Sequence, residues 1–202
     1  MKNKVMIIGI TGGIGSGKTI ASKLFEKYSV PVINADVIAK SIAENNLRVK
    51  QKIVSRFGAE SYNFNNYNRK YIAKIVFQNK KALKDLNRII HPPTFVKIKN
   101  KINLLEPQKN KYCIIEAALI LKTQLQKIID YIIMVEADKT IKIKRLIDAG
   151  NLSSEQIKSR MKSQMSDKEM KKYADFILLN NSSKADLKKS VSVLHKIFLS
   201  LK

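Results

Sequence analysis

The stretch GGIGSGKT, from Gly12 to Thr19, decides the fold of this chain. It matches the phosphate-binding pattern G-x-x-x-x-G-K-[ST] in full. Its glycines let several backbone N–H groups turn toward a phosphate, Lys18 can reach the β- and γ-phosphates, and the Thr19 hydroxyl can coordinate Mg²⁺. The apolar run 5–10 before it has the length of a strand, and residues 20–25 after it have the apolar spacing of a helix. A complete motif between a strand and a helix predicts a nucleoside triphosphate site rather than a glycine-rich turn that binds nothing.

The composition is typical of a globular protein, but the charge is unusual. Hydrophobic residues make up 45% and charged residues 27% of the 202 residues, which suits one soluble domain with a sizeable core. The 39 Lys and Arg against 16 Asp and Glu give a formal net charge of +23. Such a charge can indicate polyanionic partners. We favour a solvated, lysine-rich surface and expect no nucleic-acid partner, because no segment combines basic residues with base-stacking aromatics.

Three sequence features bear on the compartment. Cys113 is the one cysteine, so no internal disulfide can form, as in a reducing cytosol. The apolar run near the N-terminus leads directly into the phosphate-binding motif without a cleavage site of small residues, so a signal peptide is not expected. No stretch reaches the roughly 18 uninterrupted apolar residues of a membrane span. We therefore expect a cytoplasmic protein with no membrane partner.

Five apolar runs of strand length alternate with helical patterns: residues 5–10, 29–34, 111–117, 131–135 and 174–179. Behind a phosphate loop, this alternation predicts a three-layer α/β/α fold with a five-stranded parallel sheet. Because consecutive strands tend to be neighbours, the second strand is expected to lie beside the first. The last helix repeats apolar residues at steps of four and three from Leu187 to Leu201, which indicates a face toward the core.

Residues 46–106 differ from the rest of the chain. Tyr and Asn cluster at 61–68, which predicts a loop, and the remainder has helical spacing with no strand-like run. Pro92 and Pro93 are expected to end a helix after His91. Roughly sixty residues exceed an ordinary connection between strands, so we interpret the region as an inserted helical lobe for a second substrate.

Two acidic residues follow expected strands. Asp36 lies at the start of the helix after the second strand, and Glu116 ends the third strand. The carboxyl ends of parallel strands form the edge of the sheet where such folds bind ligands. We therefore expect Asp36 to do more than make a favourable contact with the helix dipole. Glu116 occupies a position at which nucleotide kinases often have an acid linked to Mg²⁺.

The basic helical segment after the fourth strand has features of a mobile lid. The helix expected over 139–147 carries Arg145. Ser153 and Gln156 fit a capping box at the start of a polar helix that carries Arg160. A basic helical pair at this position can cover bound phosphates. An ordinary solvated helix has the same pattern, so both interpretations stay open here.

Four motifs together resemble the dephospho-CoA kinase family: TGGIGSGKT at 11–19, INADVIAK at 33–40, LNRIIHP at 86–92 and ADFILLNN at 174–181. Their order and spacing fit over essentially the whole chain, which is far more specific than the phosphate loop alone. The resemblance implies that ATP, with Mg²⁺, phosphorylates the ribose 3′-hydroxyl of dephospho-CoA in the last step of coenzyme A biosynthesis.

The resemblance also implies a single P-loop kinase domain over 1–202. Its nucleotide-binding core would comprise 1–45 and 107–202, its helical acceptor-binding lobe 46–106 and its lid 148–172. Carried over residue by residue, it gives three catalytic residues, Asp36, Lys18 and Arg145, with Asp36 accepting the hydroxyl proton or holding Mg²⁺ together with Thr19. The acceptor would be bound by Asp36, Arg69 and His91. The expected nucleotide-binding residues are Gly12, Gly13, Ile14, Gly15, Ser16, Gly17, Lys18, Thr19, Ile20 and Asn180.

The chain departs from the family pattern at three positions. Asn34 stands where the family has the first acid of an Asp-Ala-Asp-like tripeptide, and Lys122 replaces an acid after the third strand. Ala149 stands where a second lid arginine is usual. Losing an arginine that stabilises the transition state can cost several powers of ten in rate. We hypothesise that Arg160 or a nearby lysine compensates for Ala149.

Other functions remain to be compared with this one. The nearest alternative is another P-loop kinase for a nucleotide or a small hydroxyl acceptor. The charge of +23 alone suggests a nucleic-acid-binding ATPase, whose binding would depend steeply on salt. A degenerate protein that binds ATP without turnover is a third alternative, against which the intact Lys18, Thr19 and Asp36 argue.

Overall fold

The computed structural model describes residues 4–64, 66–107, 109–121, 123–150 and 153–201. The chain divides into two compact units, one formed by Met1–Asn34 with Ile102–Lys202, the other by Ala35–Lys101. We call them the sheet unit and the helical unit. The helical unit begins before residue 46 because α2 (Ala35–Asn45) contacts α3 (Leu47–Phe57).

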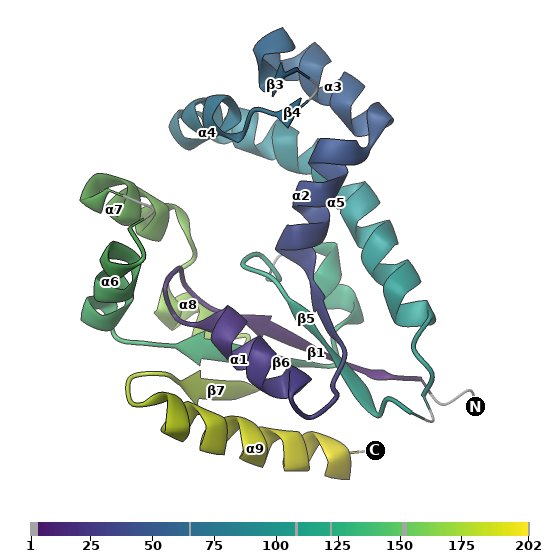
Figure 1. Cartoon of the computed structure of the whole chain (residues 1–202), viewed down its shortest axis with the longest axis vertical. Helices are drawn as coiled ribbons and strands as arrows, with labels where there is room; N and C mark the ends of the chain where they lie inside the picture. The colour runs from purple at the N-terminus through teal and green to yellow at the C-terminus, as the bar shows by residue number, and fades with distance from the viewer. Residues whose placement is uncertain (1–3, 65, 108, 122, 151–152, 202) are drawn as a thin grey trace. The chain divides into compact units, whose positions relative to one another are not determined.

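A five-stranded parallel sheet organises the sheet unit (Figure 1). Its spatial order is β2-β5-β1-β6-β7. The strands are β1 (Met6–Thr11), β2 (Val32–Asn34), β5 (Tyr112–Glu116), β6 (Tyr131–Glu136) and β7 (Phe176–Leu179). The phosphate-binding motif follows the central strand β1. The predicted three-layer fold with a five-stranded parallel sheet is confirmed.

The expectation that the second strand lies beside the first was wrong. β2 does not pair with β1, because β5 lies between them and pairs with both. Every residue of β5 is buried, which suits a strand covered on both faces, whereas the three-residue β2 has one buried residue and takes the edge. The burial needed by β5 therefore overrides the tendency of consecutive strands to be neighbours.

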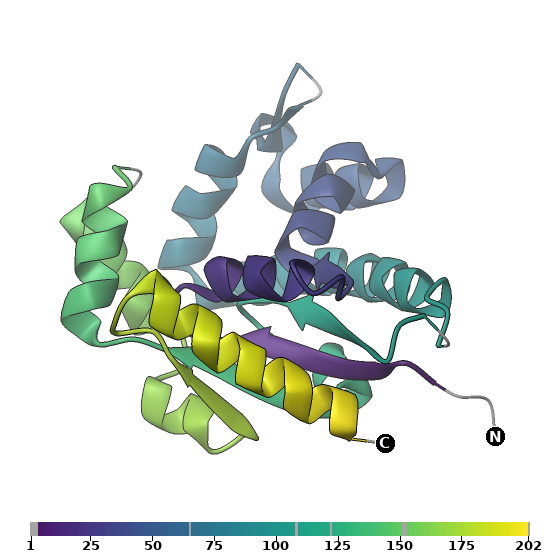
Figure 2. The same cartoon turned by 60° about the horizontal axis from the view of Figure 1, so that its bottom comes forward.

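Two helices cover one face of this sheet. α1 (Lys18–Glu26) and α9 (Lys184–Ser200) contact each other and share a hydrophobic cluster with the strands. The cluster takes alternate residues of the strands, such as Ile8 and Ile10, with Phe25 and Phe198 from the helices. Figure 2 shows α9 lying along the sheet. The core-facing stripe of the last helix is confirmed at Leu187, Val191, Leu194 and Phe198.

The opposite face is closed by shorter segments. A Cβ added to Gly9 of β1 would lie 2.8 Å from Cδ1 of Ile129 and 3.1 Å from Cδ1 of Ile120. These isoleucines flank the 3₁₀ helix η2 (Gln124–Ile128). α8 (Asp167–Lys171) contacts β6. Both faces of the sheet are therefore packed, as the apolar strands require.

The helical unit comprises α2, α3, α4 (Arg69–Gln78) and most of α5 (Lys80–Asn103), with the 3₁₀ helix η1 (Ala59–Ser61). The loop predicted at 61–68 contains a short antiparallel hairpin, β3 (Tyr62–Asn63) with β4 (Asn66–Tyr67). Its tyrosine rings lie 5.5 Å apart, and the Tyr62 hydroxyl donates to the Ala43 carbonyl over 2.6 Å. These tyrosine side chains stabilise the hairpin, whereas the Asn-rich sequence predicts only a loop.

The expected helix break at Pro92 and Pro93 was wrong. α5 continues through both prolines. Buried residues recur at steps of four on both sides of them: Ala82, Leu86, Thr94 and Ile98. The Thr94 hydroxyl donates to the Ile90 carbonyl over 2.8 Å. Burial of this row outweighs the roughly 3 kcal/mol that a proline costs inside a helix.

Between β6 and β7 the described residues form three helices, α6 (Lys139–Asp148), α7 (Ser154–Ser163) and α8. The capping box predicted at Ser153 and Gln156 is confirmed, with hydrogen bonds of 3.2 and 3.1 Å. α7 ends at Ser163 rather than near Met165, since the Ser166 side chain caps a new helix by accepting from the Glu169 N–H.

Candidate active site

The phosphate loop lies between β1 and α1, where a parallel sheet binds ligands. Gly17 has a left-handed φ of 96°, and a Cβ added there would lie 2.1 Å from Nδ2 of Asn180. Only glycine satisfies both constraints. The Lys18 ammonium donates to the carbonyls of Gly12 and Gly13 over 2.8 and 3.1 Å. The cation therefore lies across the start of the loop.

Glu116 and Thr19 form the acidic side of the site. The Thr19 hydroxyl donates to Oε1 of Glu116 over 2.6 Å, and the Asn34 side chain donates to Oε2 over 3.1 Å. Glu116 is only 5% exposed at the end of β5. Because an amide can donate where a carboxylate cannot, Asn34 stabilises the buried Glu116 charge. The position of Glu116 in the sequence indicates a metal-linked acid, although the family resemblance does not include it among the expected site residues.

These oxygens suit Mg²⁺. A hydroxyl and a carboxylate are hard ligands, and Mg²⁺ in phosphate-transfer sites takes one or two protein ligands with waters and substrate phosphates. Within the described ranges, no three His, Cys, Asp or Glu side chains gather as a metal cluster. Thr19 and Glu116 thus provide a partial site that a nucleotide would complete.

Asn180 and Arg145 lie against the other end of the loop. Asn180 is buried, and its Nδ2 donates to the Ser16 carbonyl over 2.8 Å. Arg145 of α6 donates through Nη2 to the Asn180 carbonyl over 2.9 Å and to its Oδ1 over 3.4 Å. Arg145 Nη1 is buried without a hydrogen-bond partner among the described residues. The structure therefore brings both predicted residues to the loop, next to Gly17.

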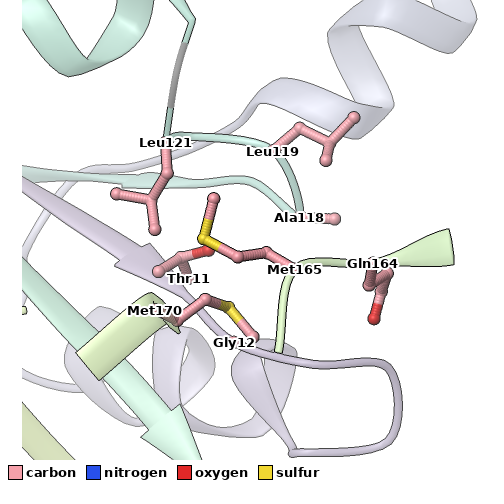
Figure 3. Close-up of a pocket in the computed structure, with 8 residues that line it drawn as sticks. All are labelled: Thr11, Gly12, Ala118, Leu119, Leu121, Gln164, Met165 and Met170. Atoms are coloured by element: carbon pink, nitrogen blue, oxygen red, sulfur yellow. The ribbon is translucent and has the colours of Figure 1, made fainter. Parts of the chain in front are cut away.

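The turn between α7 and α8, which belongs to the lid expected over 148–172, also contacts the loop, through a residue that the sequence analysis did not single out. Oε1 of Gln164 accepts from the Ile14 N–H over 2.8 Å. Met165 and Met170 line a cavity of about 30 Å³ with Gly12 and Leu119, as Figure 3 shows. In the sequence Gln164 falls at the end of an expected polar helix, and only its place in the expected lid could have drawn attention to it.

Asp36, Arg69 and His91 belong to the helical unit and are described within it. Asp36 is exposed in the first turn of α2, as predicted. Burial lowers the pKa of His91, and the Asp36 carboxylate opposes that shift, so the two side chains influence each other. Arg69 begins α4, where its charge opposes the burial that raises the pKa of Tyr67 to about 12.

The remaining positions noted in the sequence lie near the expected lid. Ala149 follows α6 directly, and Arg160 belongs to α7. Lys122 lies outside the described residues. No helix in the described part of the chain has the length and apolar character to cross a membrane.

The fold and the site define a P-loop kinase: a phosphate loop after the central strand of a parallel sheet, with its threonine bonded to an acid at a strand end. The family model described as dephospho-CoA kinase matches residues 6–186. The chain belongs to the dephospho-CoA kinase family.

Individual relatives are similar to this chain over nearly its whole length. A dephospho-CoA kinase from Fusobacterium nucleatum is 38% identical over 188 residues, covering 93% of this chain and 95% of that protein. The crystal structure of TT1252 from Thermus thermophilus has a TM-score of 0.82 at 26% identity and covers 96% and 98% of the two chains. A dephospho-CoA kinase structure from Campylobacter jejuni has a TM-score of 0.61 at 27% identity, with coverages of 95% and 96%. The chain is thus a kinase, with ATP as co-substrate and a small-molecule acceptor.

Proposed function

We propose that this chain transfers the γ-phosphoryl group of ATP to the ribose 3′-hydroxyl of dephospho-CoA and so completes coenzyme A. Membership of the dephospho-CoA kinase family over residues 6–186 carries the proposal. The intact phosphate loop with Lys18 and the Thr19–Glu116 hydrogen bond supports it, because a protein that had lost turnover would not need them. We place the enzyme in the cytoplasm, where the reduced, buried Cys113 is stable.

The sheet unit binds ATP in this proposal. The phosphate loop and the start of α1, residues 12–20, hold the phosphates, and Lys18 leaves the Gly12 and Gly13 carbonyls to pair with the β- and γ-phosphates. Arg145 stabilises the negative charge of the phosphoryl group during its transfer, and Asn180 orients the adenine. Moving Lys18 from two carbonyls to phosphate oxygens replaces neutral acceptors by charged ones, which strengthens its hydrogen bonds.

Mg²⁺ would be held by Thr19 and by Glu116, to which Thr19 is hydrogen-bonded. Bound there, the ion supplies positive charge to the phosphate oxygens as the phosphoryl group is transferred. Glu116 holds the Thr19 hydroxyl in place, and Asn34 holds Glu116. Asp36, two residues after Asn34 in the chain, is the further ligand of this ion that the family resemblance implies.

The helical unit binds the acceptor, and residues 148–172 cover the phosphates as a lid. Asp36 accepts the proton of the 3′-hydroxyl, which a positioned carboxylate accelerates by about a hundredfold or more. Burial lowers the pKa of His91 and so favours its neutral form, in which it can orient Asp36 or the ribose without adding charge. Arg69, exposed at the start of α4, is placed to pair with a phosphate of the acceptor.

Turnover with defined acceptors tests this function. The purified protein is incubated with ATP, Mg²⁺ and dephospho-CoA, and the product is identified by mass. We expect CoA to form, and Lys18→Met to abolish its formation while leaving the protein folded. Nucleoside monophosphates and shikimate serve as control acceptors. ATP binding without CoA formation, or preferred turnover of a control acceptor, would contradict the proposal.

A further inference from the structure

We propose that Gln164 binds the terminal phosphate of ATP: its Oε1 is anchored on the phosphate loop, and its Nε2 donates to a γ-phosphate oxygen. The inference rests on the proposed function, since it requires ATP at the loop. It adds a phosphate-recognising residue from the turn between α7 and α8, a segment that none of the expected site residues includes.

The hydrogen bond to Ile14 fixes the orientation of the Gln164 amide. A backbone N–H can only donate, so the atom 2.8 Å from the Ile14 nitrogen must be the oxygen. Because Nε2 is bonded to the same carbon as this oxygen, its two N–H groups stay close to the loop. These N–H groups are uncharged donors. When a nucleotide binds the loop, a phosphate oxygen is the acceptor to which they can donate.

The position of the anchor points to the γ-phosphate. In this type of loop the backbone holds the inner phosphates, and the lysine reaches the outer two. Here the Lys18 ammonium lies on the carbonyls of Gly12 and Gly13, directly before Ile14 in the chain. Gln164 is therefore anchored next to the cation that serves the outer phosphates.

Gln164 is held in place by apolar packing. It is the C-cap of α7, with extended backbone angles of −87° and 159°. Met165 and Met170 follow it and line the small cavity beside Thr11 and Gly12 (Figure 3). Met170 is buried. The turn that carries Gln164 thus packs against the start of the loop.

An ion pair between a buried lysine and a half-buried aspartate fixes the same turn from the other side. Lys142 of α6 is 4% exposed, and its Nζ pairs with Oδ2 of Asp167 over 2.5 Å. A Cβ added to Gly13 would lie 3.5 Å from both side chains, so the pair sits directly on the loop. Because this pair and the apolar packing hold the turn, and the Ile14 bond holds the amide, ordering the Gln164 amide costs little when a phosphate binds.

Two near-isosteric variants separate the anchor from the donor. Gln164→Leu removes both, whereas Gln164→Glu keeps an oxygen for the Ile14 N–H and replaces the donor by a negative charge. Affinities for ATP and ADP, each with Mg²⁺, are measured by isothermal titration calorimetry. For Gln164→Leu we expect about a tenfold loss for ATP and less than about threefold for ADP, as for one hydrogen bond to a charged group. Gln164→Glu should lose more ATP affinity than Gln164→Leu, because its carboxylate repels the phosphate.

Three outcomes decide the inference. Equal losses for ATP and ADP would overturn it, since Gln164 would then only shape the loop. Wild-type affinities in Gln164→Glu would overturn it as well. If the wild-type protein bound neither nucleotide, the proposed function would fail first, which is a different result from a missing ATP–ADP difference in the variants. Ser163→Ala, one residue away and exposed, is the control and should keep wild-type affinities and melting temperature.

Discussion

The hydroxyl of Thr19 lies 2.6 Å from Oε1 of Glu116 and donates to it. This bond joins the end of the phosphate loop to the end of β5, two segments separated by 97 positions in the chain. A buried carboxylate is costly unless it is hydrogen-bonded, and here Thr19 and Asn34 satisfy one oxygen each. The pair therefore fixes a negative charge at the place where a nucleotide-bound cation is needed.

We expect Glu116→Gln to lower kcat by about a hundredfold and to raise the Mg²⁺ concentration required for half-maximal rate, because the charge that attracts the ion is lost. Steady-state rates over a Mg²⁺ titration provide the measurement. Glu136→Gln, at the end of β6, removes a carboxylate that pairs with Lys171 and should change the rate less than about threefold. An unchanged Mg²⁺ requirement in Glu116→Gln would argue against the metal role.

Gly17→Ala should reduce ATP affinity at least about tenfold and lower the melting temperature, since alanine is strained at this φ and its Cβ displaces Asn180 from the Ser16 carbonyl. Gly150→Ala is the matched control. It has a φ of 67° with nothing within 4 Å of the added Cβ, so it reports backbone strain alone. Equal effects of the two variants on ATP affinity would show that the Asn180 contact is unimportant.

Asp36→Asn should lower kcat at least about a hundredfold while ATP affinity stays within about twofold, because the amide cannot accept the hydroxyl proton. Stopped assays with dephospho-CoA and calorimetric ATP titrations measure the two quantities. Asp85→Asn, in the same unit, tests the general effect of losing a carboxylate, since Asp85 pairs with Arg56 over 2.8 Å. A parallel loss of ATP affinity in Asp36→Asn would move Asp36 from acceptor chemistry to nucleotide binding.

Arg145→Ala should lower kcat about a hundredfold or more, because Arg145 lies at the loop and supplies charge to the transferring phosphoryl group. If Arg160 compensates for Ala149, Arg160→Ala should lower kcat at least about tenfold. The two single variants are compared with the double variant by steady-state rates. A normal rate for Arg160→Ala would exclude that compensation.

His195 should make the fold less stable at acid pH. Burial lowers its pKa, so below about 6.5 the unfolded chain binds a proton that the folded protein resists. The stability is complete above that pH and is lost as pH falls through the lower folded pKa. Urea unfolding at pH 7.5 and 5.5 measures the loss, which should shrink in His195→Phe. His91, with its pKa lowered as well, contributes in the same direction; an unchanged loss in the variant would rule out His195.

The hydrophobic pattern predicted the fold well because each strand of the sheet is a separate apolar run. The capping box at Ser153 was predictable as well, since it depends on two residue types three positions apart. The hydrophobic pattern failed where distant contacts decide. The place of β2 depends on the burial needs of β5, and α5 continues through Pro92 because of packing on both sides.

The same distinction between local motifs and distant contacts applies to the site. The phosphate loop is contiguous in sequence, so its residues could be assigned directly. Gln164 could not, because its bond to Ile14 spans 150 positions and nothing in the local pattern distinguishes it from a solvated glutamine. Lys142 looked like one more surface lysine, yet it is buried against Asp167.

The order of the strands has a consequence for how the chain is made. β1 pairs with β5 and β6, so the first strand to leave the ribosome has to wait for residues beyond 110 before it gains either neighbour. The segment Ala35–Lys101 is complete by then, with contacts that are internal to it. Vectorial synthesis therefore favours early folding of the helical unit, while the nucleotide-binding sheet closes only after β6 and β7 have been translated.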